Sequence, residues 1–157
     1  MSLPDSGSDP GRIRSADGGD GNGQGWRLFD FRGSGTWPDH WPAAEYRRET
    51  DRLVRFRQMP PETAVNHFGT LHGAFLAGVA ENALGLFLAK EGQGPVPAVT
   101  VSLSLDYAAP GKAGMLLEGE LELIRDSYHM QFLRLTLSQD GAPVLHGSGI
   151  LKKLKSA

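Results

Sequence analysis

One stretch of the sequence decides the fold: residues 66–89, which read NHFGTLHGAFLAGVAENALGLFLA. The second half of this stretch is apolar on every side, lacks Pro and has few β-branched residues. Such a pattern predicts a helix over residues 73–89 that is buried all round. A single ionisable residue, Glu81, interrupts it.

Glu81 is the first candidate for chemistry. A carboxylate in the middle of a buried helix costs free energy unless another group pairs with it or uses it. Gly78 and Gly85 lie one turn to either side. Each glycine costs a helix roughly 1 kcal/mol against Ala, which makes sense if a ligand or another backbone approaches this face. We therefore interpret Glu81 as a catalytic carboxylate, with a solvated position on a half-exposed helix as the alternative.

The start of the helix is the second candidate. The first four N–H groups of a helix have no internal partner, and the helix dipole adds about half a positive charge there. A glycine at this place, Gly73, would let a substrate carbonyl come close to the backbone. Its N–H group is therefore a candidate oxyanion-hole donor.

Gly73 and Glu81 of one helix would not reach the same carbonyl. At 1.5 Å per residue they lie about 12 Å apart along the axis, whereas an attacking group must come within about 3–3.5 Å of the reacting carbon. Glu81 of a second, oppositely directed copy could reach a carbonyl held at Gly73. The spacing therefore predicts a homodimer with the active site across its interface.

The composition excludes several classes of protein. The chain has 157 residues, a net charge of -2 and no Cys. We therefore expect one domain with a core, no nucleic-acid partner, no disulfide, no thiolate metal site and no Cys nucleophile. The sequence contains no apolar run of about 18 residues and no apolar leader, so we expect no membrane span, no secretory signal and a cytoplasmic location. The candidate residues require no metal and no cofactor.

Alternating apolar residues predict five strands, over residues 53–58, 99–107, 115–124, 131–138 and 144–154. In the second strand five residues would share one face: Val99, Val101, Leu103, Leu105 and Tyr107. Thr100 would lie on the opposite face. Short turns, including Asp140-Gly141, join the last four strands, as antiparallel pairing allows. The predicted fold class is therefore α+β, an antiparallel sheet wrapped around one long central helix.

These residues resemble the hotdog-fold acyl-CoA thioesterases of the phenylacetate-degradation type, the PaaI-like thioesterases. The shared motif is Asn66, then His72-Gly73 six residues later, then the acid Glu81 nine residues after that His. The strand 99–107 and the following Pro110-Gly111 also fit the family pattern, and the resemblance covers about residues 45–154. It implies a hotdog fold and an enzyme that hydrolyses the thioester of an aryl- or medium-chain acyl-CoA to free acid and CoA.

The resemblance also implies roles for five residues. Asn66 would orient substrate or the attacking water, His72 would lie beside the thioester, and the Gly73 N–H would bind the thioester oxygen. Glu81 would act as general base or nucleophile, with Thr100 near the attacking water. In this family the acid comes from the opposite subunit of a homodimer, and dimers often pair into tetramers.

The sequence departs from the family pattern at several places. Glu81 stands where Asp is usual, so the side chain that carries the catalytic carboxylate is one methylene group longer. Ala74, expected among the substrate-binding residues, replaces a common second Gly. The turn at residues 125–128, where CoA phosphates can dock, lacks a Gly often found there.

The resemblance and the composition together suggest three segments. Residues 1–25 are rich in Gly, Ser and Asp and are predicted to form a disordered tail. Residues 26–44 form an aromatic arm that contains all three Trp residues and matches nothing in the family. We interpret the arm as packed on the domain, with a lid over an acyl pocket as the alternative. Residues 45–157 would be the hotdog thioesterase domain.

Simpler roles remain open for the polar residues. His72 could merely cap the helix, Asn66 could be a turn residue, and His67 is interpreted as a structural loop residue. His129 and His146 lie on predicted strands without an assigned partner.

Two other functions also remain open. One is a hotdog dehydratase or hydratase acting on (R)-hydroxyacyl thioesters, which would have Pro where Gly69 follows Phe68. The other is a non-catalytic acyl-CoA-binding protein, which would not need Glu81.

Overall fold

The computed structural model describes residues 25–30, 32–33, 35–88 and 96–154. Apart from Gly25, the predicted tail lies outside this range, and so do Phe31 of the aromatic arm and the last predicted helical residue, Ala89. In the described residues one α-helix, α1 (Gly73–Leu84), is followed directly by a 3-10 turn, η2 (Gly85–Phe87). No described helix has both the length and the apolar character needed to cross a membrane.

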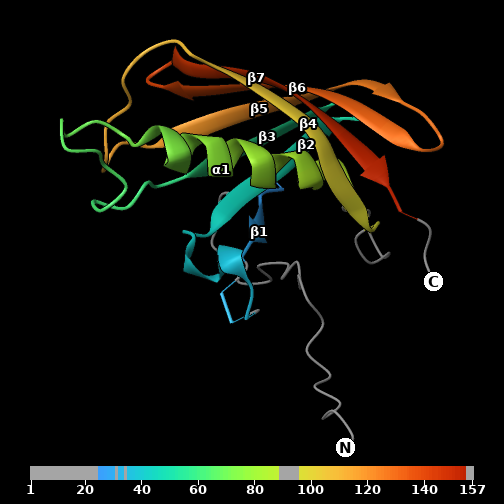
Figure 1. Ribbon diagram of the computed structural model, residues 1–157, viewed down its shortest axis with the longest axis horizontal. Helices are drawn as coiled ribbons and strands as arrows, with labels where there is room; N and C mark the ends of the chain where they lie inside the picture. Colours follow the sequence, from blue (N-terminus) through green and yellow to red (C-terminus); the bar gives the residue numbers. More distant parts are fainter. Residues whose placement is uncertain (1–24, 31, 34, 89–95, 155–157) are drawn as a thin grey trace, which may run out of the picture.

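The strands form one seven-stranded sheet in the order β1-β2-β3-β5-β6-β7-β4, with every neighbouring pair antiparallel. Their bounds are β1 (Arg27–Phe29), β2 (Ala44–Thr50), β3 (Leu53–Gln58), β4 (Ala98–Tyr107), β5 (Leu117–Asp126), β6 (Met130–Gln139) and β7 (Ala142–Lys153). The strands arch over α1 (Figure 1). The predicted antiparallel sheet around one central helix is therefore confirmed, as are the five predicted strands to within a few residues at their ends.

The core lies between α1 and the facing side of the sheet. Along β5 buried and exposed residues alternate, with Leu117, Leu121 and Leu123 inside and the intervening glutamates outside. Leu84 of α1 packs directly on β7, because a Cβ on Gly149 would lie 2.6 Å from its Cδ1. The absence of a side chain at Gly149 thus sets how closely the helix approaches the sheet.

The prediction that α1 is buried all round and reaches Ala89 is wrong for the described chain. The helix buries five residues, Leu76, Val79, Ala80, Ala83 and Leu84. Ala74 and Glu81 are exposed, since the sheet covers only one side of the cylinder. The helix ends at Leu84 because Gly85, a poor helix former, caps it with its N–H directed to the carbonyls of Asn82 and Ala83.

The strict alternation predicted for β4 is also wrong. The register with β7 shifts between Thr100 and Ser102, so Val101 is the extra residue of a β-bulge. Val99 and Val101 are 46% and 50% exposed, although the alternation placed them on the same face as Leu103, which packs against the core. The bulge instead turns Thr100 toward α1, because it reverses the order of the two faces along the strand.

The aromatic arm packs on the domain, as interpreted from the sequence. β1 extends the sheet by pairing with β2. The ring of Trp41 stacks on Phe75 of α1 with centroids 5.6 Å apart and planes at 11°. Phe29 meets Tyr46 of β2 edge-on at 6.2 Å. The arm therefore covers a side of α1 that the rest of the sheet leaves open.

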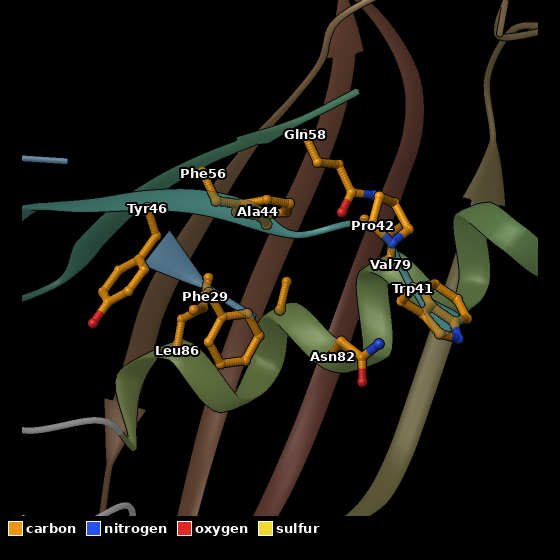
Figure 2. Close-up of a pocket in the computed structure, with 11 residues that line it drawn as sticks. Phe29, Trp41, Pro42, Ala44, Tyr46, Phe56, Gln58, Val79, Asn82 and Leu86 are labelled. Carbon is orange, nitrogen blue, oxygen red and sulfur yellow. The ribbon is translucent and has the colours of Figure 1, made fainter. Parts of the chain in front are cut away.

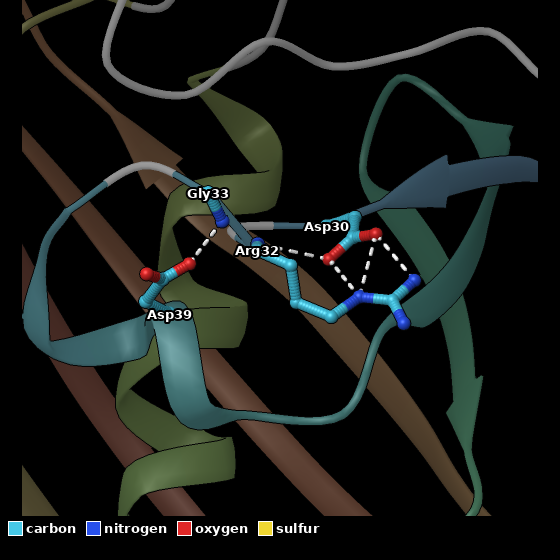
Figure 3. A network of polar contacts seen from close by, with 4 residues as sticks. All are labelled: Asp30, Arg32, Gly33 and Asp39. Atoms are coloured by element: carbon cyan, nitrogen blue, oxygen red, sulfur yellow. Dashed lines mark hydrogen bonds and ion pairs between the residues drawn. The ribbon is translucent and has the colours of Figure 1, made fainter.

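Two polar contacts hold the bend of the arm (Figure 3). The Asp30 carboxylate accepts from the Arg32 guanidinium at 2.9 and 3.0 Å at Nε and at 2.6 Å at Nη2. Asp39 accepts from the backbone N–H of Gly33. The hydrogen bond to Asp30 and its charge raise the pKa of Arg32 above its usual range.

Candidate active site

His72 is the N-cap residue of α1. Its Nδ1 accepts the N–H of Ala74 at 3.0 Å, and its carbonyl accepts those of Phe75 and Leu76 at 3.0 and 3.2 Å. The capping role considered for His72 is thus present in the structure. The N–H of Gly73 is left as the first-turn donor without an acceptor among the described residues.

The loop before the helix is built by Asn66. Its Oδ1 accepts the N–H of Phe68 at 2.9 Å and of Thr70 at 3.3 Å, and its Nδ2 donates to Thr70 Oγ1 at 3.0 Å. Gly69 takes the left-handed conformation, with φ +78°, that closes this turn. Asn66 therefore has the turn-forming role that was the simpler interpretation, and its predicted contact with substrate stays a prediction.

Glu81 meets Thr100 at the β4 bulge. The Thr100 hydroxyl donates to Glu81 Oε1 at 2.8 Å. Both groups are open to solvent on the side of α1 that carries Ala74. A hydroxyl that donates to one carboxylate oxygen fixes the direction in which the other oxygen points. The pair therefore forms an exposed, oriented carboxylate, a suitable base or nucleophile.

The structure does not bring Gly73 and Glu81 together within one chain. Both lie on the continuous helix α1, whose rise of 1.5 Å per residue separates them by about 12 Å. Within one chain, the N–H donor at the start of α1 and the carboxylate two turns further on therefore lie too far apart to contact the same carbonyl.

Tyr107 was missed as a site residue from the sequence. Its hydroxyl donates to the carbonyl of Gly73 at 3.0 Å, and its Cε1 lies 3.4 Å from the place of a Cβ on Gly73. The ring thus fixes the first residue of the helix from the end of β4. The only signal in the sequence was its place at the end of a predicted strand, on the face shared with Leu103 and Leu105.

Gln139 is a second missed residue, and it supports the loop beside the site. It is 5% exposed. Its Nε2 donates to the carbonyls of Lys112 and Met115 at 2.8 and 3.0 Å, and its Oε1 accepts the N–H of Lys112 at 2.7 Å. The same loop accepts the N–H of Leu71, next to His72, through the Gly111 carbonyl at 2.8 Å.

Replacing Gln139 with leucine is expected to lower the free energy of unfolding by about 2–4 kcal/mol, because three backbone groups lose their partner in a buried place. Urea unfolding followed by circular dichroism measures this. Gln131→Leu is the matched control. Gln131 lies on the same strand and is also buried, but its Oε1 has no hydrogen-bond partner in the described part of the chain. Equal losses in the two variants would contradict the assigned role of Gln139.

The remaining histidines have local contacts. The ring centroids of His67 and Phe68 lie 3.9 Å apart. His129 lies in the turn before β6, not on a strand as predicted, and its ring meets Tyr128 edge-on with centroids 4.6 Å apart. His146 Nδ1 lies 3.1 Å from Thr136 Oγ1 on the neighbouring strand. These contacts agree with structural positions for all three.

The predicted turn at residues 125–128 is shorter in the structure. β5 continues through Asp126, and Ser127 closes the reversal by accepting the N–H of Met130 on its hydroxyl at 3.0 Å. Lys153 reaches over from β7 to pair with Asp126. The Ser127 hydroxyl and the ion pair between Lys153 and Asp126 thus stabilise this turn, which contains no glycine.

Comparison with known proteins identifies the family. The model of the thioesterase superfamily matches residues 68–144. A Pseudomonas aeruginosa protein provisionally named an esterase is 33% identical to this chain over 104 residues. The aligned residues make up 66% of this chain and 78% of that protein.

Solved structures share the fold at lower identity. A hypothetical thioesterase protein with coenzyme A from Streptococcus pneumoniae superposes with a TM-score of 0.64 at 18% identity, over 72% of this chain and 87% of that one. The Escherichia coli PaaI protein of the phenylacetic acid degradation operon gives 0.60 at 16% identity, over 67% and 75%. With the fold, the sequence motif and the relative in agreement, this chain belongs to the thioesterase superfamily of hotdog-fold proteins and is a thioester hydrolase.

Proposed function

We propose that the protein hydrolyses an acyl-CoA thioester, with Glu81 of one subunit acting on a carbonyl bound at Gly73 of the other. The observation that carries this proposal is the hydrogen bond of 2.8 Å between Thr100 and Glu81. It holds a carboxylate in a set direction on the uncovered face of α1. The coenzyme A in the Streptococcus pneumoniae neighbour supports CoA as the carrier of the acyl group.

The chemistry follows from the Gly73 N–H and the Glu81 carboxylate. The Gly73 N–H and the positive end of α1 would stabilise the negative charge that develops on the thioester oxygen, an effect typically worth about 10²–10³ in rate. Glu81 would take a proton from water as it attacks the carbonyl carbon, or would attack that carbon itself. When water attacks, the C–S bond then breaks, the thiolate of CoA leaves and takes up a proton, and the free acid remains. When Glu81 attacks, the same cleavage leaves the acyl group on Glu81 as a mixed anhydride, which water would then hydrolyse to release the free acid.

A second copy of the chain would complete the site. β4 is an edge strand of the sheet, and its exposed valines, Val99 and Val101, lie beside the open face of α1 that carries Glu81. Antiparallel pairing of two β4 edges would place the two helices in opposite directions. Each Glu81 would then face the Gly73 end of its partner, and such dimers could pair again into a tetramer.

The loop conformation does not favour the dehydratase alternative. Gly69 has a φ of +78°, whereas the ring of a proline holds φ near -65°. The Pro expected there in hotdog dehydratases could not adopt this turn, so the loop suits the thioesterase.

Release of free CoA from a panel of aryl-, short-, medium- and long-chain acyl-CoAs tests the proposed function. Glu81-dependent release from aryl- or medium-chain members is the expected result, with Glu81→Gln run alongside. No release from any member by folded, dimeric protein would overturn the proposal in favour of acyl-CoA binding or of water addition to an enoyl-CoA.

Replacing Thr100 with valine is expected to lower kcat about 10-fold. Valine keeps the shape of the side chain but removes the hydrogen-bond donor to Glu81. The lost hydrogen bond, which orients the carboxylate, is worth about 1–1.5 kcal/mol in the activation free energy. Steady-state kinetics on the best acyl-CoA measure this, with Thr100→Ser expected to recover most of the rate. Ser102→Ala, across the bulge, is the matched control and should keep the wild-type kcat. A Thr100→Val enzyme with the wild-type kcat would exclude the positioning role.

A further inference from the structure

A small cavity lies between the aromatic arm, the strands β2 and β3, and α1 (Figure 2). Its volume is about 30 Å³. Four aromatic side chains line it, Phe29, Trp41, Tyr46 and Phe56. Two carboxamides share the lining, Gln58 from β3 and Asn82 from α1, which Figure 2 shows on different sides of the cavity.

Gln58 is the unexplained group in this cavity. Its side chain is only 7% exposed, and its Nε2 has no hydrogen-bond partner among the described residues. A buried N–H donor without an acceptor costs about 1–3 kcal/mol. A ligand atom that accepts a hydrogen bond from Gln58 Nε2 inside this mostly apolar cavity would remove that cost.

The cavity shares a stretch of α1 with the proposed catalytic carboxylate, although Glu81 itself does not line it. Asn82, on its wall, directly follows Glu81 on α1. Trp41 forms another wall by lying across Gly78, so close that a Cβ there would overlap the ring. Gly78 precedes Glu81 by one helical turn. An acyl group whose carbonyl lies beside Glu81 would have to pass Trp41 to enter the cavity, over about one helical turn, roughly 5 Å along the axis of α1.

The lining decides which chemistry fits the far end of the acyl group. Among the described residues no Asp, Glu, Lys or Arg lines the cavity, so a charged tail would be buried without a counter-charge. A volume of about 30 Å³ is far below the roughly 150 Å³ of an apolar cavity that holds a benzene ring, and so admits a slender tail. Gln58 supplies an N–H donor, which matches a neutral acceptor oxygen.

We propose that this cavity receives the far end of a slender aliphatic acyl group that carries a hydroxyl or keto oxygen, and that Gln58 selects this oxygen by donating a hydrogen bond to it. The inference rests on the proposed function, because it names the acyl class of the same site. It assigns a task to the aromatic arm, since Trp41 and Phe29 enclose the cavity that the hotdog domain alone would leave open. Gln58 contacts the tail and not the reacting carbon, so it determines specificity.

Hexanoyl-CoA and 6-hydroxyhexanoyl-CoA are the test pair. Wild-type protein is expected to favour the hydroxylated substrate about 10-fold in kcat/KM, since one satisfied buried donor is worth about that ratio. In Gln58→Leu the ratio should fall to about one. Gln131→Leu, which removes a buried amide elsewhere, should keep the wild-type ratio. Gln58→Met repeats the test with a different side chain should Gln58→Leu fold poorly.

Equal kcat/KM for the two substrates in wild-type protein would overturn the inference, as would an undiminished preference in the folded Gln58 variants. Either result would assign the cavity to a bound water that satisfies Gln58. Calorimetry with 6-hydroxyhexanoate and hexanoate separates this inference from the proposed function. Gln58-dependent preference for the hydroxylated acid in a protein that releases no CoA would sink the proposed function and keep the binding site. If instead the protein released CoA but showed no Gln58-dependent preference, the proposed function would stand and the binding site for the acyl tail would be excluded.

Discussion

Replacing Glu81 with glutamine is expected to lower kcat for acyl-CoA hydrolysis by about 10²–10⁴-fold, the usual contribution of a positioned general base. Glutamine keeps the size of the side chain and can still accept from Thr100, but it can neither take a proton from water nor attack the thioester. KM should change little, because the carboxylate acts on the reacting atoms. Steady-state release of CoA from the best acyl-CoA measures both constants.

The fold should survive this change, since Glu81 is exposed and outside the core. Thermal unfolding within a few degrees of the wild type would establish that. Glu118→Gln is the matched control, an exposed glutamate on the outer side of β5, and it should keep the wild-type kcat. If Glu81→Gln retained most of the activity, another group would have to activate the nucleophile.

Mixing two inactive variants is expected to restore about a quarter of the wild-type activity. Gly73→Val would cover the N–H donor and press on Tyr107, whose ring lies 3.4 Å from the place of a Cβ. Glu81→Ala removes the carboxylate. With random exchange about half the dimers are hybrids, and each hybrid has one intact site of two, built from Gly73 of one subunit and Glu81 of the other.

This result would test the shared site directly. Native mass spectrometry before and after mixing should show that subunits exchange, and each variant alone should stay inactive. Hybrid dimers present without activity would show that Gly73 and Glu81 do not act across the interface. Gly73 and Glu81 would then have to act on separate thioesters, or one of them would not take part in the reaction.

Much of the fold was predictable because local periodicity carries it. Apolar residues every second position predicted β3, β5, β6 and β7, and the apolar run after Gly73 predicted α1. The left-handed turn at Asp140-Gly141 also follows from its residues, with φ of 49° and 73°. These features depend on neighbours along the chain, which the sequence lists in order.

The candidate site was predictable in part. His72 and Gly73 were expected at the start of α1 and lie there, since a helix start needs a cap and unpaired N–H groups. Glu81 was expected on the helix, but its exposure was only the alternative interpretation. A helix that is apolar all round implies full burial, whereas one chain supplies a sheet on only one side of α1. The uncovered face becomes visible only when the layers are assembled.

The sequence by itself determined the helix, the strands, the hairpin turn and the spacing of His72, Gly73 and Glu81, because each depends on short-range preferences and periodicity. Only the tertiary structure decided that Thr100 turns toward Glu81, that Tyr107 donates to Gly73 and that Gln58 Nε2 is buried beside the aromatic arm with no partner among the described residues. These contacts depend on the register between strands, on one bulge in β4 and on the close approach of the arm to Gly78. No local pattern encodes such long-range pairings, because one extra residue in a strand exchanges its two faces.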